Sequence, residues 1–311
     1  MAVGAENVHT SVLLAETIEL LSPNPGEVFV DATLGLGGHT KALLEKEATL
    51  HVIVIDQDLD AMTIAKGRLA AFEDRVEFRH ANFTDIKRFV ERADGILADL
   101  GVSSLQFDSE TRGFSFRFDS PLDMRMDADS EAETAAEMLE KLTEEEIANL
   151  IYRYGEERFS RRIARRIVER RRAGDPVRTT KDLAELVERA VSRKPKDKIH
   201  PATKTFQALR IAVNRELEVL ERFLKDAIDI LTPNGRLAII SFHSLEDRMV
   251  KQAFLRASGR CQCPPRIPQC QCGAKREVEI LTKKPITAGP EELDLNPRSR
   301  SAKLRAVRKL V

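Results

Sequence analysis

The sequence contains no apolar run that approaches the roughly 18 residues needed for a membrane-spanning helix. The segment from Met1 to Thr10 also lacks the charged-then-apolar pattern of a secretory signal. All four cysteines lie between Cys261 and Cys272, which excludes a framework of disulfides distributed through a secreted fold. We therefore expect a cytoplasmic protein with no membrane association.

The chain also lacks a net charge, because 50 Lys and Arg residues balance 50 Asp and Glu residues among its 311 residues. This neutral average hides local asymmetry, which is more informative about partners. A hydrophobic fraction of 42% supports a sizeable core, and the length suits one large domain or two smaller ones.

A glycine-rich stretch near the N-terminus organises the rest of the chain. The strand pattern Val28–Asp31 leads into Gly35 and Gly37 and then into a helical pattern. Glycine permits positive φ and close ligand approach, and a helix N-terminus offers unpaired N–H donors. Dinucleotides and S-adenosylmethionine both bind at such turns, but Thr40 breaks the dinucleotide pattern G-x-G-x-x-G. The stretch favours S-adenosylmethionine over a nicotinamide cofactor, and a turn without a ligand is the alternative.

Acidic residues end three of the predicted buried strands. These are Asp31, Asp56 after Leu50–Ile55, and Asp99 after Gly95–Ala98. Nearly continuous apolar strands are typical of a parallel sheet, whose carboxyl ends meet at the ligand-binding edge. Asp56 is suited to accept hydrogen bonds from ribose hydroxyls, and a helix-capping carboxylate is the alternative reading.

Two further groups follow strands at the same predicted edge. Phe83 comes shortly after the strand Val76–His80, and its ring either stacks on an adenine or packs in the core. The fifth strand, Arg236–Phe242, ends in a cluster containing His243 and Glu246, which can hold or move protons. A cap of the next helix by Ser244 is the alternative.

The segment 109–200 contains no buried-strand pattern and predicts a helical insertion. Its helix Arg158–Arg172 has one apolar face and a dense cover of arginines, which suits a polyanion. Arg112–Asp119 interleaves aromatic and basic residues, as in single-stranded nucleic-acid binding or in a half-buried strand. After the insertion, the apolar stripe from Phe206 to Leu224 predicts one long helix.

The four cysteines form two C-x-C pairs, Cys261 with Cys263 and Cys270 with Cys272. Four thiols this close could bind zinc. The spacing is tighter than the usual C-x₂₋₄-C, so we expect no metal site, with zinc as the alternative.

Taken together, these segments resemble the RsmH (MraW) family of bacterial S-adenosylmethionine-dependent methyltransferases. The resemblance covers nearly the whole chain and rests on HTSVLL at His9, DATLGLGGHT at Asp31, VID at Val54, DLGVSS at Asp99, RGFSF at Arg112, YGEERFSRRIARRI at Tyr154, HPATKTFQALRIAVNREL at His200 and SFHSLEDR at Ser241. It implies methylation at N4 of a cytidine in the decoding region of 16S ribosomal RNA within an assembled small ribosomal subunit.

The resemblance also implies positions for the cofactor. The contacts map onto Gly37, Gly38, His39, Asp56, Phe83, Asp99 and Gln106. We expect a class I methyltransferase fold, an α/β Rossmann-like sheet made of residues 1–108 and 201–311. Residues 109–200 would be an inserted all-helical RNA-recognition domain.

The chemistry supports N4 methylation independently, because an exocyclic amine can attack a sulfonium methyl group directly once it is aligned. We expect Asp99 or the nearby loop to polarise the amine and accept its proton, directly or through water, with His243 and Glu246 orienting the base. A non-catalytic ribosome-assembly factor and a DNA amino-methyltransferase are the alternatives. The absence of a proline-proline-aromatic motif after Asp99 argues against the second. The sequence leaves the oligomeric state open, with a homodimer as one option.

Overall fold

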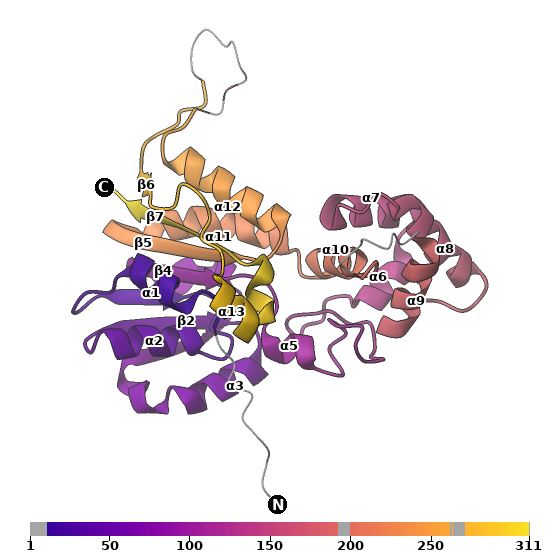
Figure 1. Ribbon diagram of the computed structural model, residues 1–311, viewed down its shortest axis with the longest axis horizontal. Helices are drawn as coiled ribbons and strands as arrows, with labels where there is room; N and C mark the ends of the chain where they lie inside the picture. Colours follow the sequence, from indigo (N-terminus) through magenta and orange to yellow (C-terminus); the bar gives the residue numbers. More distant parts are fainter. Residues whose placement is uncertain (1–10, 192–199, 262, 264–270, 311) are drawn as a thin grey trace, which may run out of the picture. The chain divides into compact units, whose positions relative to one another are not determined.

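The computed structural model describes residues 11–191, 200–261, 263 and 271–310. The chain divides into two compact units (Figure 1). Unit 1 comprises Met1–Gly101 and Leu217–Val311, and unit 2 comprises Val102–Glu216. Unit 2 is thus longer at both ends than the predicted insertion 109–200.

Two features that were singled out in the sequence lie outside the described residues. They are the start of the first family motif at His9 and Thr10, and the cysteine Cys270. The basic run Lys194–Lys198 lies outside them as well. None of the described helices is long and apolar enough to cross a membrane.

Unit 1 is built on one sheet, which has seven strands within the described residues, in the order β3-β2-β1-β4-β5-β7-β6. The first five in this order are parallel, β7 is antiparallel to β5, and β6 is antiparallel to β7. The strands are β1 (Val28–Asp31), β2 (His51–Asp56), β3 (Val76–His80), β4 (Ala93–Asp99), β5 (Leu231–Ser241), β6 (Val278–Ile280) and β7 (Lys303–Lys309).

Helices cover both faces of this sheet. Alternate side chains of each central strand point to opposite faces, and both sets are apolar, so both faces must be covered. Ile53 and Ile55 of β2 pack with the helices α4, α11 and α12, whereas Val52 and Val54 pack with α1, α2 and α3. The helical elements of unit 1 are α1 (Leu14–Leu21), α2 (Gly38–Lys46), α3 (Leu59–Arg68), η1 (Ala70–Arg75), η2 (Phe83–Asp85), α4 (Ile86–Phe89), α11 (Glu216–Ile230), α12 (Ser244–Ala257), α13 (Pro290–Leu295) and η3 (Pro297–Ser301).

The strand order turns around between β1 and β4. The chain proceeds from β1 to β2 and β3 on one side, and then returns to place β4 and β5 on the other. Ligands of open α/β sheets bind outside the carboxyl ends of the strands at such a switch point. Asp31 and Asp99 end the two strands at this point. The topology confirms the class I methyltransferase fold expected from the sequence.

Unit 2 is helical and has its own apolar core, which includes Ile147, Ile151, Ile163, Ile167 and Leu209. Its described residues contain no strand, only an isolated bridge between Pro121 and Thr179. The helices are α5 (Ser104–Asp108), α6 (Ala135–Lys141), α7 (Glu144–Gly155), α8 (Ser160–Arg172), α9 (Thr180–Ala190) and α10 (Thr203–Val213).

The aromatic segment Arg112–Asp119 is a loop, so the strand interpretation of its alternating pattern was wrong. Phe114 is buried, and Phe116 stacks on His200 with ring centroids 4.5 Å apart. Phe118 is 37% exposed. Two of the three rings therefore belong to the core of unit 2, and one faces solvent.

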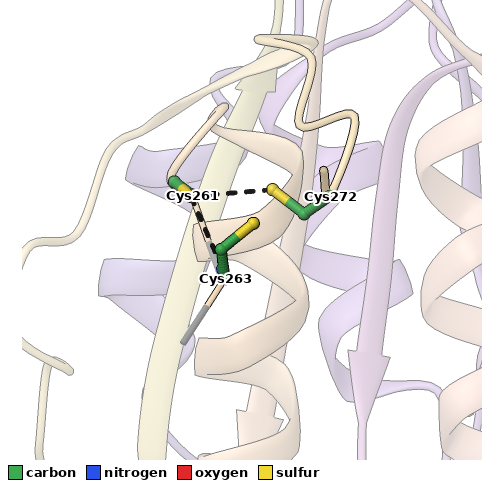
Figure 2. A group of neighbouring side chains, drawn as sticks. All are labelled: Cys261, Cys263 and Cys272. Carbon is green, nitrogen blue, oxygen red and sulfur yellow. Dashed lines mark hydrogen bonds between the residues drawn. The ribbon is translucent and has the colours of Figure 1, made fainter. Parts of the chain in front are cut away.

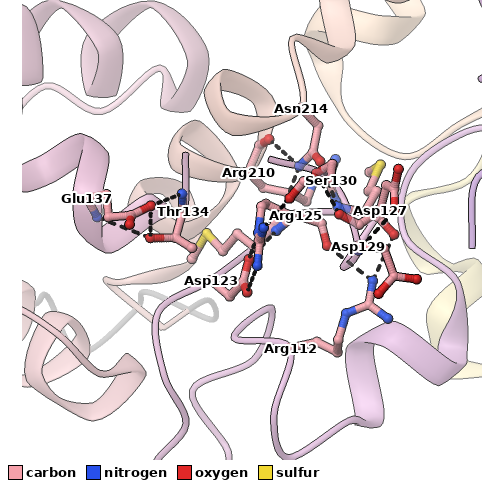
Figure 3. A network of polar contacts seen from close by, with 12 residues as sticks. Arg112, Asp123, Arg125, Asp127, Asp129, Ser130, Thr134, Glu137, Arg210 and Asn214 are labelled. Carbon is pink, nitrogen blue, oxygen red and sulfur yellow. Dashed lines mark hydrogen bonds and ion pairs between the residues drawn. The ribbon is translucent and has the colours of Figure 1, made fainter. Parts of the chain in front are cut away.

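A polar network fixes the loop between α5 and α6 (Figure 3). Arg125 binds both carboxylate oxygens of Asp123 at 2.7 and 2.8 Å, and this pairing raises its pKa. Arg112 donates to the carbonyls of Arg125 and Met126 at 3.1 and 2.7 Å. These charge-assisted bonds hold a loop that has no regular backbone ladder of its own.

The predicted single helix from Phe206 to Leu224 was wrong, because the chain breaks at Asn214. The Asn214 side chain accepts from the backbone N–H of Met126 at 2.8 Å and donates to the carbonyl of Met124 at 2.8 Å. Arg215 then adopts a left-handed conformation with φ of 50°. The break ends α10 in unit 2 and begins α11, whose apolar face packs in unit 1.

Candidate active site

The glycine-rich loop leaves β1 and enters α2 at the switch point of the sheet. Gly35 and Gly37 have φ angles of 51° and 77°, in the left-handed region that favours glycine, and Gly37 is the N-cap of α2. A Cβ atom added to Gly38 would lie 2.1 Å from the Oγ of Ser11. The positive φ angles and this close approach explain why three glycines are needed here.

Asp31 ties the end of β1 to α2. Its carboxylate accepts from the hydroxyl of Thr40 at 2.6 Å and from the backbone N–H of Thr33 at 3.2 Å. The side chain is fully buried, and burial raises its pKa from 3.8 to about 6. Asp31 therefore holds the loop in place from within.

Asp56 fixes the same loop from the neighbouring strand. Its carboxylate accepts from the backbone N–H of Gly35 at 2.7 Å and of Asp58 at 2.9 Å, and burial raises its pKa. Helix α3 is instead capped by Asp58, which accepts from the N–H groups of Asp60 and Ala61. Asp56 is thus not the helix cap that the sequence left as an alternative.

Asp99 ends β4 on the other side of the switch point. Its backbone N–H donates to the hydroxyl of Thr33 at 2.6 Å. Its Oδ1 atom is buried and has no hydrogen-bond partner among the described residues. Burial, followed by the charges of Asp31 and Glu246, raises the Asp99 pKa well above its usual value. The group is therefore an unusually basic carboxyl whose hydrogen-bonding capacity is incompletely used.

His39 lies in the first turn of α2 and is 6% exposed. Its Nε2 lies 3.0 Å from the carbonyl of Val12, and a carbonyl only accepts, so this nitrogen carries the proton. Its Nδ1 is 4.0 Å from Oδ2 of Asp99. The structure thus brings His39 and Asp99, both predicted site residues, close together.

His243 and Glu246 form the N-terminal cap of α12. The Nδ1 of His243 accepts from the backbone N–H of Glu246 at 3.4 Å. The Glu246 carboxylate accepts from the N–H groups of Phe242 at 2.8 Å and His243 at 3.3 Å. A cap was the alternative interpretation of this cluster, but His243 makes it and not Ser244. Next along the helix, Asp247 pairs with Arg305 of β7 at 2.7 Å.

Phe83 and Gln106 complete the set of predicted cofactor contacts. Phe83 packs edge-on against Phe223 in the core, with ring centroids 4.9 Å apart. Gln106 belongs to unit 2, where it shares a capping box with Ser103 and donates to the carbonyl of Met126 at 3.2 Å. The cofactor roles of both residues stay predictions.

The sequence did not single out Thr33, Thr40 or Ser11 as parts of the site. Each contributes a hydroxyl beside the loop, to Asp99, to Asp31 and beside Gly38, respectively. The two threonines follow Asp31 by two and nine residues, but this spacing acquires meaning only once β1, β4 and α2 are adjacent.

Three carboxyl groups with raised pKa values thus lie at one edge of the sheet around a glycine-rich helix N-terminus. Burial raises the pKa of Asp99 most, and the charges of Asp31 and Glu246 add to it, so a cationic ligand would offset this effect. The bare amides would accommodate a close approach by that ligand. The arrangement suits a small polar cofactor that carries positive charge.

A model of the MraW methylase family matches residues 6–310. The chain belongs to this family. It is 54% identical over 304 residues to Ribosomal RNA small subunit methyltransferase H of Gloeobacter violaceus, covering 97% of this chain and 88% of that protein. It is 50% identical over 309 residues to the protein of the same name from Syntrophotalea carbinolica, with coverage of 97% and 98%.

The cofactor of this MraW methylase is S-adenosylmethionine. The residues present fit it, because its sulfonium and amino groups carry positive charge and the site is lined by the acids Asp31, Asp56 and Asp99. The roles of the glycine-rich loop and Asp56 in holding the cofactor stay predictions.

Proposed function

We propose that this MraW methylase transfers a methyl group to the exocyclic N4 of a cytidine in 16S ribosomal RNA, within the small ribosomal subunit in the cytoplasm. Two lines of support carry the proposal. The relatives are named as small-subunit ribosomal RNA methyltransferases. The buried Oδ1 of Asp99, with no partner among the described residues, can accept a hydrogen bond from an amino group.

The reaction needs a nucleophile, an electrophile and a proton acceptor. S-adenosylmethionine supplies an electrophilic methyl group on its sulfonium. With the cofactor bound, the N4 lone pair would form the new bond to the methyl carbon as the carbon–sulfur bond broke, and the amine would have to lose one proton. Asp99 accepts a hydrogen bond from the amine, draws electron density toward the lone pair and takes the proton. Its raised pKa suits this step, because a general base works best near the operating pH.

His39 and Thr33 position Asp99 for this step. The hydroxyl of Thr33 fixes the backbone at the end of β4, and His39 lies beside Oδ2. Neither residue is required to touch the base.

His243 and Glu246 are proposed to act through position and charge. Their capping box sets the N-terminus of α12 at the carboxyl end of β5. The Glu246 charge contributes to the raised pKa of Asp99, after burial and the charge of Asp31. The sequence predicted that His243 and Glu246 orient the base. In this proposal the backbone at the start of α12, which their cap holds in place, does so instead.

Methylation at carbon-5 of cytosine is disfavoured by the distribution of thiols. That reaction normally uses a cysteine beside the cofactor, and every cysteine of this chain lies in the segment 261–272. None lies at the carboxyl end of β1, β2, β4 or β5. An amine nucleophile needs no covalent adduct.

Unit 2 is proposed to bind RNA through part of α8. Arg170 and Arg171 of this helix are engaged within the unit: Arg170 pairs with Asp175 and Asp182, and Arg171 donates to three carbonyls at the end of α6. Arg161 and Arg165 are exposed, but the Nε atom of Arg165 lies 3.7 Å from Oε1 of Glu144. Arg161 is therefore the better candidate for a phosphate contact.

The Asp99→Asn variant tests the mechanism. Loss of a positioned general base typically costs about 10²–10⁴-fold in rate. We expect a loss of this size in methyl transfer to small subunits, with the RNA dissociation constant nearly unchanged. Asp60→Asn, which alters an exposed acid on α3, is the matched control. Full activity of Asp99→Asn would reject Asp99 as the proton acceptor.

A further inference from the structure

Three cysteines outside the active site converge in the connection between α12 and β6 (Figure 2). The Sγ atoms of Cys261, Cys263 and Cys272 all lie within 4.8 Å of one another. The base of the connection is closed by a bridge between Ser258 and Arg276. Cys263 and Cys272 are nine residues apart in the sequence, and their thiols come together in a connection that the bridge between Ser258 and Arg276 closes.

The spacing of the sulfur atoms suits a shared metal ion. Cys261 and Cys272 have Sγ atoms 3.8 Å apart. Tetrahedral zinc with Zn–S bonds of about 2.3 Å requires neighbouring sulfurs about 3.8 Å apart. A disulfide between these two residues would instead require about 2.05 Å. The two sulfurs therefore have the separation of two ligands of one ion.

Backbone donors point at two of the sulfurs. The N–H of Cys263 donates to Sγ of Cys261 at 3.4 Å, and the N–H of Gln271 donates to Sγ of Cys263 at 3.3 Å. These two bonds hold the thiols of Cys261 and Cys263 close to the backbone of the connection.

The surroundings of the thiols give a reason for a metal. Cys261 and Cys272 are exposed and Cys263 is half-buried, so apolar packing does not hold these side chains together. Thiolates select zinc or iron–sulfur clusters over the oxygen-loving Mg²⁺ and Ca²⁺. The proximity of the three sulfurs, all within 4.8 Å of one another, matches a single zinc ion.

We propose that Cys261, Cys263 and Cys272 are ligands of a structural Zn²⁺ ion that cross-links the connection between α12 and β6. Binding displaces the thiol protons and involves no change of oxidation state. The ion takes no part in methyl transfer, because none of its ligands belongs to the group around Asp99. This proposal reverses the expectation from the C-x-C spacing that the chain holds no metal.

Metal analysis of the purified full-length chain tests the site. After dialysis under reducing conditions with added ZnCl₂, we expect one zinc ion per chain by inductively coupled plasma mass spectrometry. The variants Cys261→Ser, Cys263→Ser and Cys272→Ser should each lose most of the zinc. Ala274→Ser, which adds a hydroxyl close to Cys272 and removes no thiol, should retain it.

Cobalt substitution reports the geometry independently of activity. Co²⁺ bound to the apo protein should give sulfur-to-metal charge-transfer absorption and the intense visible bands of a tetrahedral site. S-adenosylmethionine binding by each serine variant provides the check that unit 1 is folded. Wild-type protein that takes up no zinc, a triple serine variant that binds as much as wild type, or iron in place of zinc would each overturn the proposal.

Discussion

The backbone N–H of Asp99 donates a hydrogen bond of 2.6 Å to the side-chain hydroxyl of Thr33. This bond joins the end of β4 to the loop after β1, across the point where the strand order turns around. The carboxyl group proposed to accept the substrate proton is therefore held by the same loop that is proposed to hold the cofactor. Changes in that loop should alter catalysis even where they do not touch the substrate.

Thr33→Val tests this connection. Valine keeps the shape of threonine but leaves the Asp99 N–H without its acceptor, which costs about 1–3 kcal/mol when the donor is buried. We expect a lower free energy of unfolding in urea and a lower kcat, with a smaller change in KM. Thr33→Ser, which keeps the hydroxyl, should be close to wild type. Equal behaviour of the two variants would show that the bond has no positioning role.

Gly38→Ala tests the close approach at the start of α2. The added methyl group would overlap Oγ of Ser11, so we expect weaker S-adenosylmethionine binding by isothermal titration calorimetry. The double variant Gly38→Ala with Ser11→Ala removes that oxygen and should recover most of the affinity. Gly67→Ala, where a Cβ meets no neighbour within 4 Å in α3, should leave binding unchanged. Absence of rescue would contradict the steric explanation.

Asp31 makes stability depend on pH. A carboxyl whose pKa is raised by folding holds its proton more tightly in the folded chain, so its contribution to stability is lost as pH rises from about 4 to about 6. A rise from 3.8 to about 6 corresponds to about 3 kcal/mol. Asp31→Asn should remove this dependence. If the free energy of unfolding changed with pH in the same way for wild type and Asp31→Asn between pH 4 and 7, this role of Asp31 would be contradicted.

Glu246→Gln tests the electrostatic role of the α12 cap. The amide oxygen can still accept from the N–H groups of Phe242 and His243, but the negative charge near Asp99 is removed. The pKa of Asp99 should fall, so the rising limb of kcat/KM should move to lower pH. The exposed Glu91→Gln is the matched control. A limb that moves to higher pH or stays in place would exclude the charge effect.

Two arginines of α8 should separate RNA binding from stability. Arg161→Ala should weaken RNA binding and lower its salt slope by about 1 without changing thermal stability. Arg171→Ala should instead destabilise unit 2 by about 1–3 kcal/mol, because three carbonyls at the end of α6 lose their donor. If Arg161→Ala left both the RNA affinity and the salt slope unchanged, the proposed phosphate contact of Arg161 would be excluded.

The sheet could be predicted from the sequence because each strand has a local signature. The strand Val76–His80 is reproduced residue for residue, and Asp31, Asp56 and Asp99 do end their strands. Buried parallel strands are short apolar runs between turns, and such runs can be recognised without knowledge of their partners.

The helix break at Asn214 could not be predicted in the same way. The stripe from Phe206 to Leu224 is continuous in sequence, but its first part packs in unit 2 and its second part in unit 1. Hydrophobic periodicity shows which face of a helix is buried, but it does not show which part of the protein that face packs against. The bonds from Asn214 to Met124 and Met126, about 90 residues away in sequence, carry no local signature.

The site shows the same limit. The acids and glycines stood out because they recur after strands, whereas Thr33 matters only through its contact with Asp99, 66 residues away. His243 and Glu246 were recognised as a cluster, but their capping geometry depends on where α12 begins. Residue type and position along the chain thus indicated the chemistry, and the structure supplied the connections.

The most direct test is transfer of labelled methyl groups from S-adenosylmethionine to small ribosomal subunits that lack the modification, with naked RNA and DNA in parallel. Nucleoside mass spectrometry of the product distinguishes N4-methylcytidine from 5-methylcytidine. We expect the label on the small subunit, as N4-methylcytidine at a single position. Label at carbon-5, or no label on any of the three substrates despite measurable cofactor binding, would contradict it.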